Sequence, residues 1–210
     1  MANRNSQGAR ANRWVEWQRW VDARLGKLTP ARRAHCERVG ELAALLCRAY
    51  GEDWEEVAQL AGRAHDTARE LGAQGWFEEA ARLGLDVGPE ERETPVLLHG
   101  PVAAAWMEEA GVGTPAVWAA VRFHTTAAPG LDVGSRAVYV ADGIEPGRNY
   151  PQADVLRRLA VRDLDQAYRE VLAGSEAYLR TRGLSPHPLA LLARAEAGTG
   201  QVCDERGARD

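Results

Sequence analysis

The sequence predicts an all-α protein, and three observations support that fold class. Apolar residues recur at intervals of three and four along most of the chain, as on one face of an α-helix. No segment keeps the two-residue alternation of a half-buried strand, and the short run Val138–Val140, which has β-propensity, lies within a helical pattern. Thr-Pro and Ser-Pro pairs recur and predict helix starts, because the hydroxyl caps a helix and proline fits its first turn.

Three helices are expected in the first third of the chain. They follow a polar segment, residues 1–13, that we expect to be disordered. Tryptophans and apolar residues at helical spacing predict a short amphipathic helix over residues 14–25. A second helix is expected over 30–50, and a third over 53–66, where Asp53 and the residue three positions later have the pattern of a capping box.

The rest of the chain is expected to be helical with one irregular stretch, residues 67–93. Further helices are expected from Thr94 with a break at Gly100-Pro101, then over 114–124, over 136–143, over 154–182 and from Ser185. Residues 14–197 then form a single domain with a C-terminal helical extension, and residues 198–210 a frayed tail.

Charge and cysteine content exclude several classes of protein. A formal net charge of −4 gives no basic footprint for nucleic acid. The polar N-terminus lacks the apolar run of a signal peptide, and no window reaches the roughly 18 apolar residues of a membrane span. Three cysteines without a CxxC pair favour a reducing compartment. We therefore expect a cytoplasmic protein without nucleic-acid or membrane partners.

Histidines and aspartates gather at the ends of the expected helices, and one further histidine, His35, lies on the apolar face of the second helix. The set comprises His35, His65, Asp66, His99, His124 and Asp142. Imidazoles and carboxylates are ligands that iron, manganese, cobalt and zinc share. Six such residues exceed the needs of one closed tetrahedral site, and they suit two metals that share a bridging carboxylate. The set therefore predicts a two-metal centre.

Each of these residues alone has an ordinary structural explanation. A single histidine on an apolar helix face, such as His35, is more often a packed and hydrogen-bonded core residue. His99 and Asp142 equally suit capping or polar-surface roles. The ordered series of His, His-Asp, His, His and Asp in a helical chain favours the metal centre over these alternatives.

The series also resembles a known family. The segments RAHCERVGELAALL, AHD, LLHGPVAA, FHTT and VYVADGIEPGR are similar to the successive motifs of the HD superfamily of metal-dependent phosphohydrolases. More narrowly they resemble the YqeK-type hydrolases, which cut diadenosine tetraphosphate symmetrically. The likeness extends over residues 28–192, because NYPQADVLRRLAVRDLDQAYREVL continues it beyond the predicted metal centre.

The resemblance implies a helical bundle that holds two divalent metal ions, with iron favoured and manganese, cobalt or zinc as alternatives. It implies that His35, His65, Asp66 and Asp142 bind one metal, and that Asp66 bridges to a second metal held by His99 and His124. A hydroxide between the metals would attack phosphorus. Asp66 and Arg69 are the implied catalytic residues, and Arg69, Thr125, Thr126 and Arg148 the implied substrate contacts.

Two positions depart from the family pattern. Arg69 stands where many members have a lysine, and arginine keeps the positive charge but cannot donate a proton. Ala127 stands where the family usually has a glycine, which affects the loop after the two threonines. For Arg148 the alternative to a phosphate contact is a surface arginine paired with Glu145.

The implied reaction is the symmetrical hydrolysis of diadenosine tetraphosphate to two ADP, with a nucleotide polyphosphate as substrate. Another HD-type activity, a nucleotidase or a guanosine polyphosphate hydrolase, is the nearest alternative. A di-iron oxygenase on the same scaffold and a degenerate module that senses nucleotides are the alternatives from other classes. A homodimer is left open.

Overall fold

Helices form almost all of the regular structure of the computed structural model, which describes residues 2–198 and contains no strand in that range. Side chains are described from Gly8 onward. In chain order the elements are α1 (Ala2–Leu25), α2 (Pro30–Cys47), η1 (Arg48–Tyr50), α3 (Glu52–Ala64), α4 (Gly72–Arg82), α5 (Pro89–Glu93), η2 (Pro95–Leu98), α6 (His99–Glu109), α7 (Pro115–Phe123), α8 (Val133–Ile144), α9 (Ala153–Arg162), α10 (Leu164–Thr181) and α11 (Pro188–Gly198), where η denotes a 3-10 helix. The all-α prediction is confirmed.

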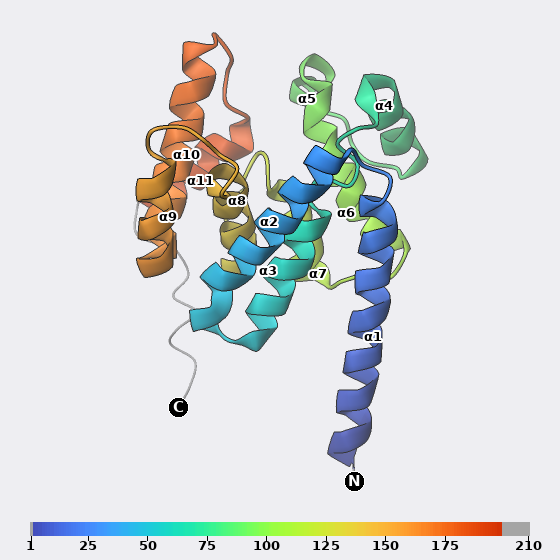
Figure 1. Ribbon diagram of the computed structural model, residues 1–210. Coiled ribbons are helices and arrows are strands. Elements are labelled where there is room, and N and C mark those ends of the chain that lie inside the picture. Colours follow the sequence, from blue (N-terminus) through green and yellow to red (C-terminus); the bar gives the residue numbers. More distant parts are fainter. Residues whose placement is uncertain (1, 199–210) are drawn as a thin grey trace.

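Helices α2, α3, α7 and α8 form the centre of the bundle (Figure 1). α8 is the most buried of them, because almost every residue from its start to Ile144 is excluded from solvent. α2 and α3 approach closely through two glycines: a Cβ built on Gly62 would lie 2.7 Å from the Cα of Gly40. This close packing fixes the C-terminal end of α3 beside the middle of α2, where the candidate ligands lie.

Side-chain caps set several helix starts as the sequence predicts. The Thr29 hydroxyl accepts a hydrogen bond from the Arg32 amide, and Thr114 caps α7 in the same way. The capping box expected at Asp53 is wrong, because α3 begins one residue earlier at Glu52 after Gly51, whose φ is 109°. Asp53 lies instead in the first turn of α3, where its negative charge interacts favourably with the positive end of the helix dipole.

Two expected helix boundaries differ from the structure. Gly100-Pro101 does not break a helix, because α6 begins at His99 and Pro101 therefore lies in the first turn, where no amide partner is lost. The single helix expected over 154–182 is two helices. Asp163 separates them with extended backbone, and its carboxylate accepts the Gln166 amide at 2.8 Å as the cap of α10.

The stretch expected to be irregular contains two helices, α4 and the short α5. At the other extreme, residues 2–13, expected to be disordered, form the first half of α1, which projects from the bundle in Figure 1. Arg10 anchors this half to α3 through ion pairs with Asp53 and Glu56, at 2.5 and 2.8 Å. Of the tail expected at 198–210, Gly198 ends α11 and residues 199–210 lie outside the described range.

None of the helices in the described range is long and apolar enough to cross a lipid bilayer.

Candidate metal centre

The fold brings all six predicted ligands together from five segments that are distant in sequence. His35 comes from the middle of α2, His65 and Asp66 follow α3, His99 begins α6, His124 follows α7, and Asp142 lies near the end of α8. The four histidines and Asp66 are buried, and Asp142 is partly exposed. The centre therefore lies inside the bundle with an opening on the Asp142 side.

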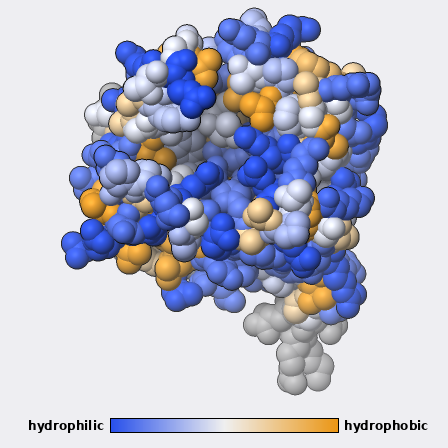
Figure 2. Space-filling view, turned by 45° about the horizontal axis from the view of Figure 1, so that its top comes forward, coloured by the Kyte–Doolittle hydropathy of each residue, from blue (hydrophilic) through white to orange (hydrophobic). Residues whose placement is uncertain are grey.

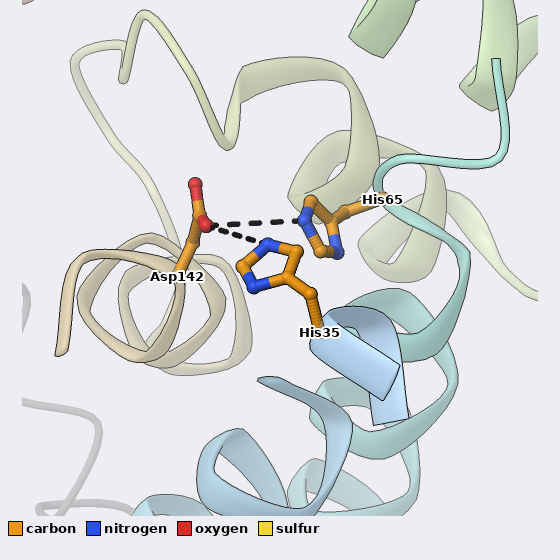
Figure 3. A group of neighbouring side chains, drawn as sticks. All are labelled: His35, His65 and Asp142. Atoms are coloured by element: carbon orange, nitrogen blue, oxygen red, sulfur yellow. Dashed lines mark ion pairs between the residues drawn. The ribbon is translucent and has the colours of Figure 1, made fainter. Parts of the chain in front are cut away.

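His35, His65 and Asp142 form the first of two groups, and Figure 3 shows both rings directed at the carboxylate. Asp142 Oδ1 lies 3.1 Å from His35 Nε2 and 3.9 Å from His65 Nε2. Asp66 Oδ2 lies 3.9 and 3.6 Å from the same two nitrogens. Two imidazole nitrogens and two carboxylate oxygens thus surround one point.

His99 and His124 form the second group, on the other side of Asp66. Asp66 Oδ1 lies 3.1 Å from His99 Nε2 and 3.7 Å from His124 Nε2. The two histidine nitrogens are 2.9 Å apart. One carboxylate therefore directs each of its two oxygens to a different pair of histidines, which is the arrangement that a bridging ligand requires.

The outer nitrogen of each ring has its own acceptor. His65 Nδ1 donates to the Gly62 carbonyl at 2.7 Å and His124 Nδ1 to the Val121 carbonyl at 2.7 Å. His99 Nδ1 contacts the Val96 carbonyl in the same way, and His35 Nδ1 lies 3.1 Å from Glu145 Oε1. Such partners hold the proton on Nδ1, so the lone pair of Nε2 faces the centre.

Most of the pKa shifts at the centre favour metal binding, and His35 is the exception: burial opposes its protonation, but Asp142 and Glu145 outweigh burial and raise its pKa, so a metal there has to displace a proton. Burial lowers the pKa of His65 to about 4 and also lowers the pKa of His99, which keeps both rings neutral at pH 7. Burial alone would raise the pKa of Asp66, but the surrounding histidines, His65 foremost, hold it well below its usual value. Desolvation likewise opposes ionisation of Asp142, and the neighbouring imidazole of His35 outweighs it and lowers the pKa.

Two buried atoms test whether these residues suit a cation. Nε2 of His35 and Nε2 of His65 have no hydrogen-bond partner, and both are directed at carboxylate oxygens. A lone pair facing an anion in a buried site is unfavourable unless a positive species lies between them. A divalent cation satisfies both nitrogens and both carboxylates at once. The donor set therefore fits a metal ion.

Three arginines surround the centre. Arg32 Nη1 lies 2.6 Å from Asp66 Oδ2, and Arg148 Nη2 lies 2.7 Å from Asp142 Oδ1. Arg69 Nη1 lies 3.2 Å from His99 Nδ1. Arg69 and Arg148 were predicted from the sequence and Arg32 was not. The sequence signal for Arg32 was its position one helical turn before His35, because residues three positions apart share a helix face.

The two threonines predicted as substrate contacts differ in orientation. Thr125 is exposed, and its Oγ1 lies 2.9 Å from His124 Nε2. The Thr126 hydroxyl instead bonds to the Ala127 carbonyl at 3.0 Å. Ala127 has a φ of 55°, the left-handed conformation that glycine adopts without strain. Ala127 therefore replaces the glycine of the family pattern but adopts the backbone conformation that favours glycine.

Glu145 is a second residue at the candidate site that sequence reasoning missed, after Arg32. It is 2% exposed and accepts hydrogen bonds from His35 Nδ1, from the Arg38 guanidinium and from the Gly147 amide at 2.6 Å. The alternative pairing of Arg148 with Glu145 is wrong: the Arg148 side chain bonds to Asp142, and only its amide contacts the Glu145 carbonyl. Glu145 thus orients His35, a candidate metal ligand, and does not pair with the side chain of Arg148.

A cavity of 570 Å³ begins at Thr125 and Thr126 and extends between α5 and η2 on one side and α8, α10 and α11 on the other. Figure 2 brings the top of Figure 1 forward and shows a hollow in this face, bordered largely by hydrophilic residues. The metal centre therefore has a neighbouring space large enough for part of a substrate.

Comparison with known proteins defines the class. The HD domain family model matches residues 32–147, which is more than half of the chain and includes all six candidate ligands. The chain belongs to the HD domain family. Binding of divalent metal is a property that this family membership and the histidine–aspartate groups both support.

Within that class the chain is similar to symmetrical bis(5'-nucleosyl)-tetraphosphatases. The protein of that name from Bacillus subtilis (strain 168) is 31% identical over 163 residues, which cover 77% of this chain and 87% of the relative. The protein of that name from Staphylococcus aureus is 35% identical over 150 residues, which cover 69% and 75%. A solved structure from Clostridium acetobutylicum, described as a predicted HD superfamily hydrolase involved in NAD metabolism, has a TM-score of 0.82 at 28% identity, and the match covers 88% of this chain and 98% of that one.

Proposed function

We propose that this chain is a metal-dependent symmetrical bis(5'-nucleosyl)-tetraphosphatase, which hydrolyses diadenosine tetraphosphate to two ADP. The observation that carries the proposal is the position of Asp66, with one carboxylate oxygen toward each of two histidine pairs. Relatives that share most of this chain bear that enzyme name. A paired centre of this kind suits the hydrolysis of a phosphate anhydride.

In the proposed assignment, His35, His65, Asp66 and Asp142 would hold one metal, and Asp66, His99 and His124 would hold the other. Iron is the proposed metal, with manganese, cobalt and zinc as alternatives. When bound, two divalent ions supply an activated water molecule and neutralise charge on the phosphate oxygens. The chain itself contributes buried imidazole rings in fixed orientations, which would hold the metal ions in place.

The arginines bind the polyphosphate. Arg32, Arg69 and Arg148 lie on the surface of the centre, and guanidinium groups suit bidentate contacts with phosphate. Arg69 cannot donate a proton to the leaving group. The proposed reaction tolerates this, because a nucleoside diphosphate leaves as an anion whose terminal phosphate has a second pKa of roughly 6.

Product analysis tests the proposal. The metal-loaded enzyme is incubated with diadenosine tetraphosphate, NAD, a guanosine polyphosphate and nucleoside monophosphates, and the products are separated by chromatography. Two ADP from diadenosine tetraphosphate, lost after chelation, are the expected result. AMP plus ATP, or faster hydrolysis of another member of the panel, would replace the proposed substrate or the proposed position of cleavage.

A further inference from the structure

The C-terminal end of α8 is held by side chains from the segment that follows it. The last carbonyls of an α-helix have no amide partner within the helix, so other donors have to satisfy them. Here the carbonyls of residues 142–145 each accept a hydrogen bond from a side chain of residues 148–157, at distances between 2.7 and 3.1 Å. The donors are Arg148, Tyr150 and Arg157. Because this helix end carries Asp142 and leads directly into Glu145, its position affects the metal centre.

Arg157 holds the point at which the chain leaves α8. Its Nη1 donates to the Ile144 carbonyl at 2.7 Å and to the Glu145 carbonyl at 3.1 Å. Nη2 of the same guanidinium pairs with Asp154 one turn earlier on α9, and α9 packs against α8 and α10 (Figure 1). A cation at the C-terminal end of a helix also interacts favourably with the helix dipole. Arg157 therefore ties the backbone at Glu145 to a helix that contributes no candidate ligand.

A tight turn directs the Glu145 carboxylate back toward α2. The Arg148 amide donates to the Glu145 carbonyl at 2.8 Å, which closes a four-residue turn over Pro146 and Gly147. The Gly147 amide donates to the carboxylate at 2.6 Å, and a Cβ on Gly147 would lie 2.8 Å from Glu145 Oε1. The carboxylate thus lies against the turn, and its direction follows the backbone that Arg157 holds.

Two contacts of the His35 ring depend on this helix end. Glu145 Oε1 lies 3.1 Å from His35 Nδ1, and Asp142 Oδ1 lies 3.1 Å from His35 Nε2. Hydrogen bonds weaken steeply as they bend, so a shift of the helix end would change the direction of the ring. The outer nitrogens of His99 and His124 contact carbonyls of η2 and α7 instead. A disturbance at the end of α8 therefore affects one group of candidate ligands more than the other.

We propose that Arg157 is a positioning residue for the metal at His35: it fixes the end of α8 through two backbone carbonyls, and Glu145 transmits that position to the ring. The inference rests on the proposed function in that His35 is a metal ligand, and it holds for any phosphate substrate. It gives a role to the segment NYPQADVLRRLAVRDLDQAYREVL, which continues the likeness to the family beyond the metal centre.

A double-mutant cycle tests the proposal. The affinity of the full chain for Co²⁺ is measured by competition with a coloured chelator for the parent, Arg157→Met, Glu145→Gln and the double variant. Loss of a group that orients a metal ligand typically changes metal affinity by about 10- to 100-fold, and Arg157 acts one step further out, so we expect a loss of at least about threefold. The loss concerns the same dissociation constant that Glu145→Gln weakens. In the Glu145→Gln background we expect Arg157→Met to change the affinity by less than about twofold, because effects that share one path do not add.

Two further variants separate positioning from a general effect on the fold. Arg158→Met replaces an exposed arginine next to Arg157 on α9 and should bind Co²⁺ with parent affinity. Arg157→Lys should recover part of the loss, because an ammonium group can donate to a carbonyl but lacks the fork of a guanidinium. If Arg157→Met does not fold, Asp154→Asn replaces it in the cycle, because Asp154 is exposed and pairs with Nη2 of Arg157.

Equal losses in the parent and in the Glu145→Gln background would overturn the proposal, because Arg157 would then act on the fold as a whole. Parent affinity in Arg157→Met would also overturn it, and so would parent affinity in Glu145→Gln, since nothing would then pass through that carboxylate. If diadenosine tetraphosphate is not cleaved but the cycle gives the expected result, the role of Arg157 stands and the proposed function fails.

Discussion

Glu145→Gln is the perturbation that best separates the proposed metal centre from a cluster of buried polar residues. The substitution keeps the shape of the side chain and removes its charge. Glu145 accepts hydrogen bonds from His35 Nδ1 and from the Arg38 guanidinium, and it is 2% exposed. A carboxylate that holds the outer nitrogen of a metal-binding histidine typically changes metal affinity by about 10- to 100-fold. We therefore expect a loss of that size at the metal held by His35, and a smaller effect at the other.

The same substitution lowers the stability of the metal-free protein. A hydrogen bond to a charged group contributes about 1.5–3 kcal/mol, and we expect the free energy of unfolding to fall by an amount in that range. Burial opposes ionisation of Glu145, but Arg38, the Gly147 amide and His35 outweigh it and lower its pKa from 4.5 to about 2. Because the folded pKa lies below the unfolded one, this stabilisation is complete above pH 4.5 and is lost as the pH falls toward 2.

Competition with a coloured chelator measures the metal affinity, and urea unfolding between pH 2 and pH 7 measures the stability. Glu41→Gln is the matched control, because Glu41 is an exposed residue one turn after Arg38 on α2. The control should keep both the parent metal affinity and the parent pH dependence. If Glu145→Gln binds both metals with parent affinity, the inference that Glu145 orients a metal ligand is refuted.

Four further predictions concern five substitutions. Asp66→Ala should empty both metal sites and abolish hydrolysis, whereas His99→Ala should mainly empty one, which elemental analysis shows; equal losses would contradict the bridge. Gly100→Ala should lower stability by about 1–3 kcal/mol, because its Cβ would lie 2.9 Å from a backbone carbonyl of α7. Ala127→Gly should change stability by less than about 1 kcal/mol, since relief of the left-handed conformation offsets the lost methyl contact; thermal unfolding checks both. Arg148→Ala should lower kcat/KM by roughly 10- to 100-fold without reducing metal content, as expected for a lost charge-assisted contact; parent kcat/KM would remove Arg148 from the substrate contacts.

The sequence was sufficient to predict the six candidate ligands because each lies at a recognisable place in a helix. His65 and Asp66 directly follow a helix end, and His99 begins the next apolar helix. Buried polar residues that recur at helix ends are unusual enough to be recognised without knowledge of the tertiary structure. The helical periodicity that predicted the fold class also placed His35 on the apolar face of its helix. What the sequence did not contain was the order of the helices in space.

Local signals also explain the errors in the helix boundaries. The Thr-Pro and Ser-Pro pairs favour helix starts wherever they occur, but Asp163 caps α10 without a neighbouring proline, so this signal does not mark the start of α10. Gly100-Pro101 resembles a helix break until the actual start at His99 is known. Residues 2–13 continue the helix, and Arg10 in this half pairs with α3, a contact between residues more than forty positions apart in the sequence. Periodicity within one segment carries no information about such a contact.

The residues missed at the site were missed for the same physical reason. In the sequence, Glu145 is a polar residue that follows an expected helix and has no distinguishing pattern. Only the packing of α2 against α8 brings its carboxylate to His35 and Arg38. Charge in a folded protein acts through space over several ångströms, whereas sequence patterns describe neighbours along a helix. The ligand type could therefore be predicted from the residues themselves, but the position of Asp66 between the two groups of histidines required the tertiary structure.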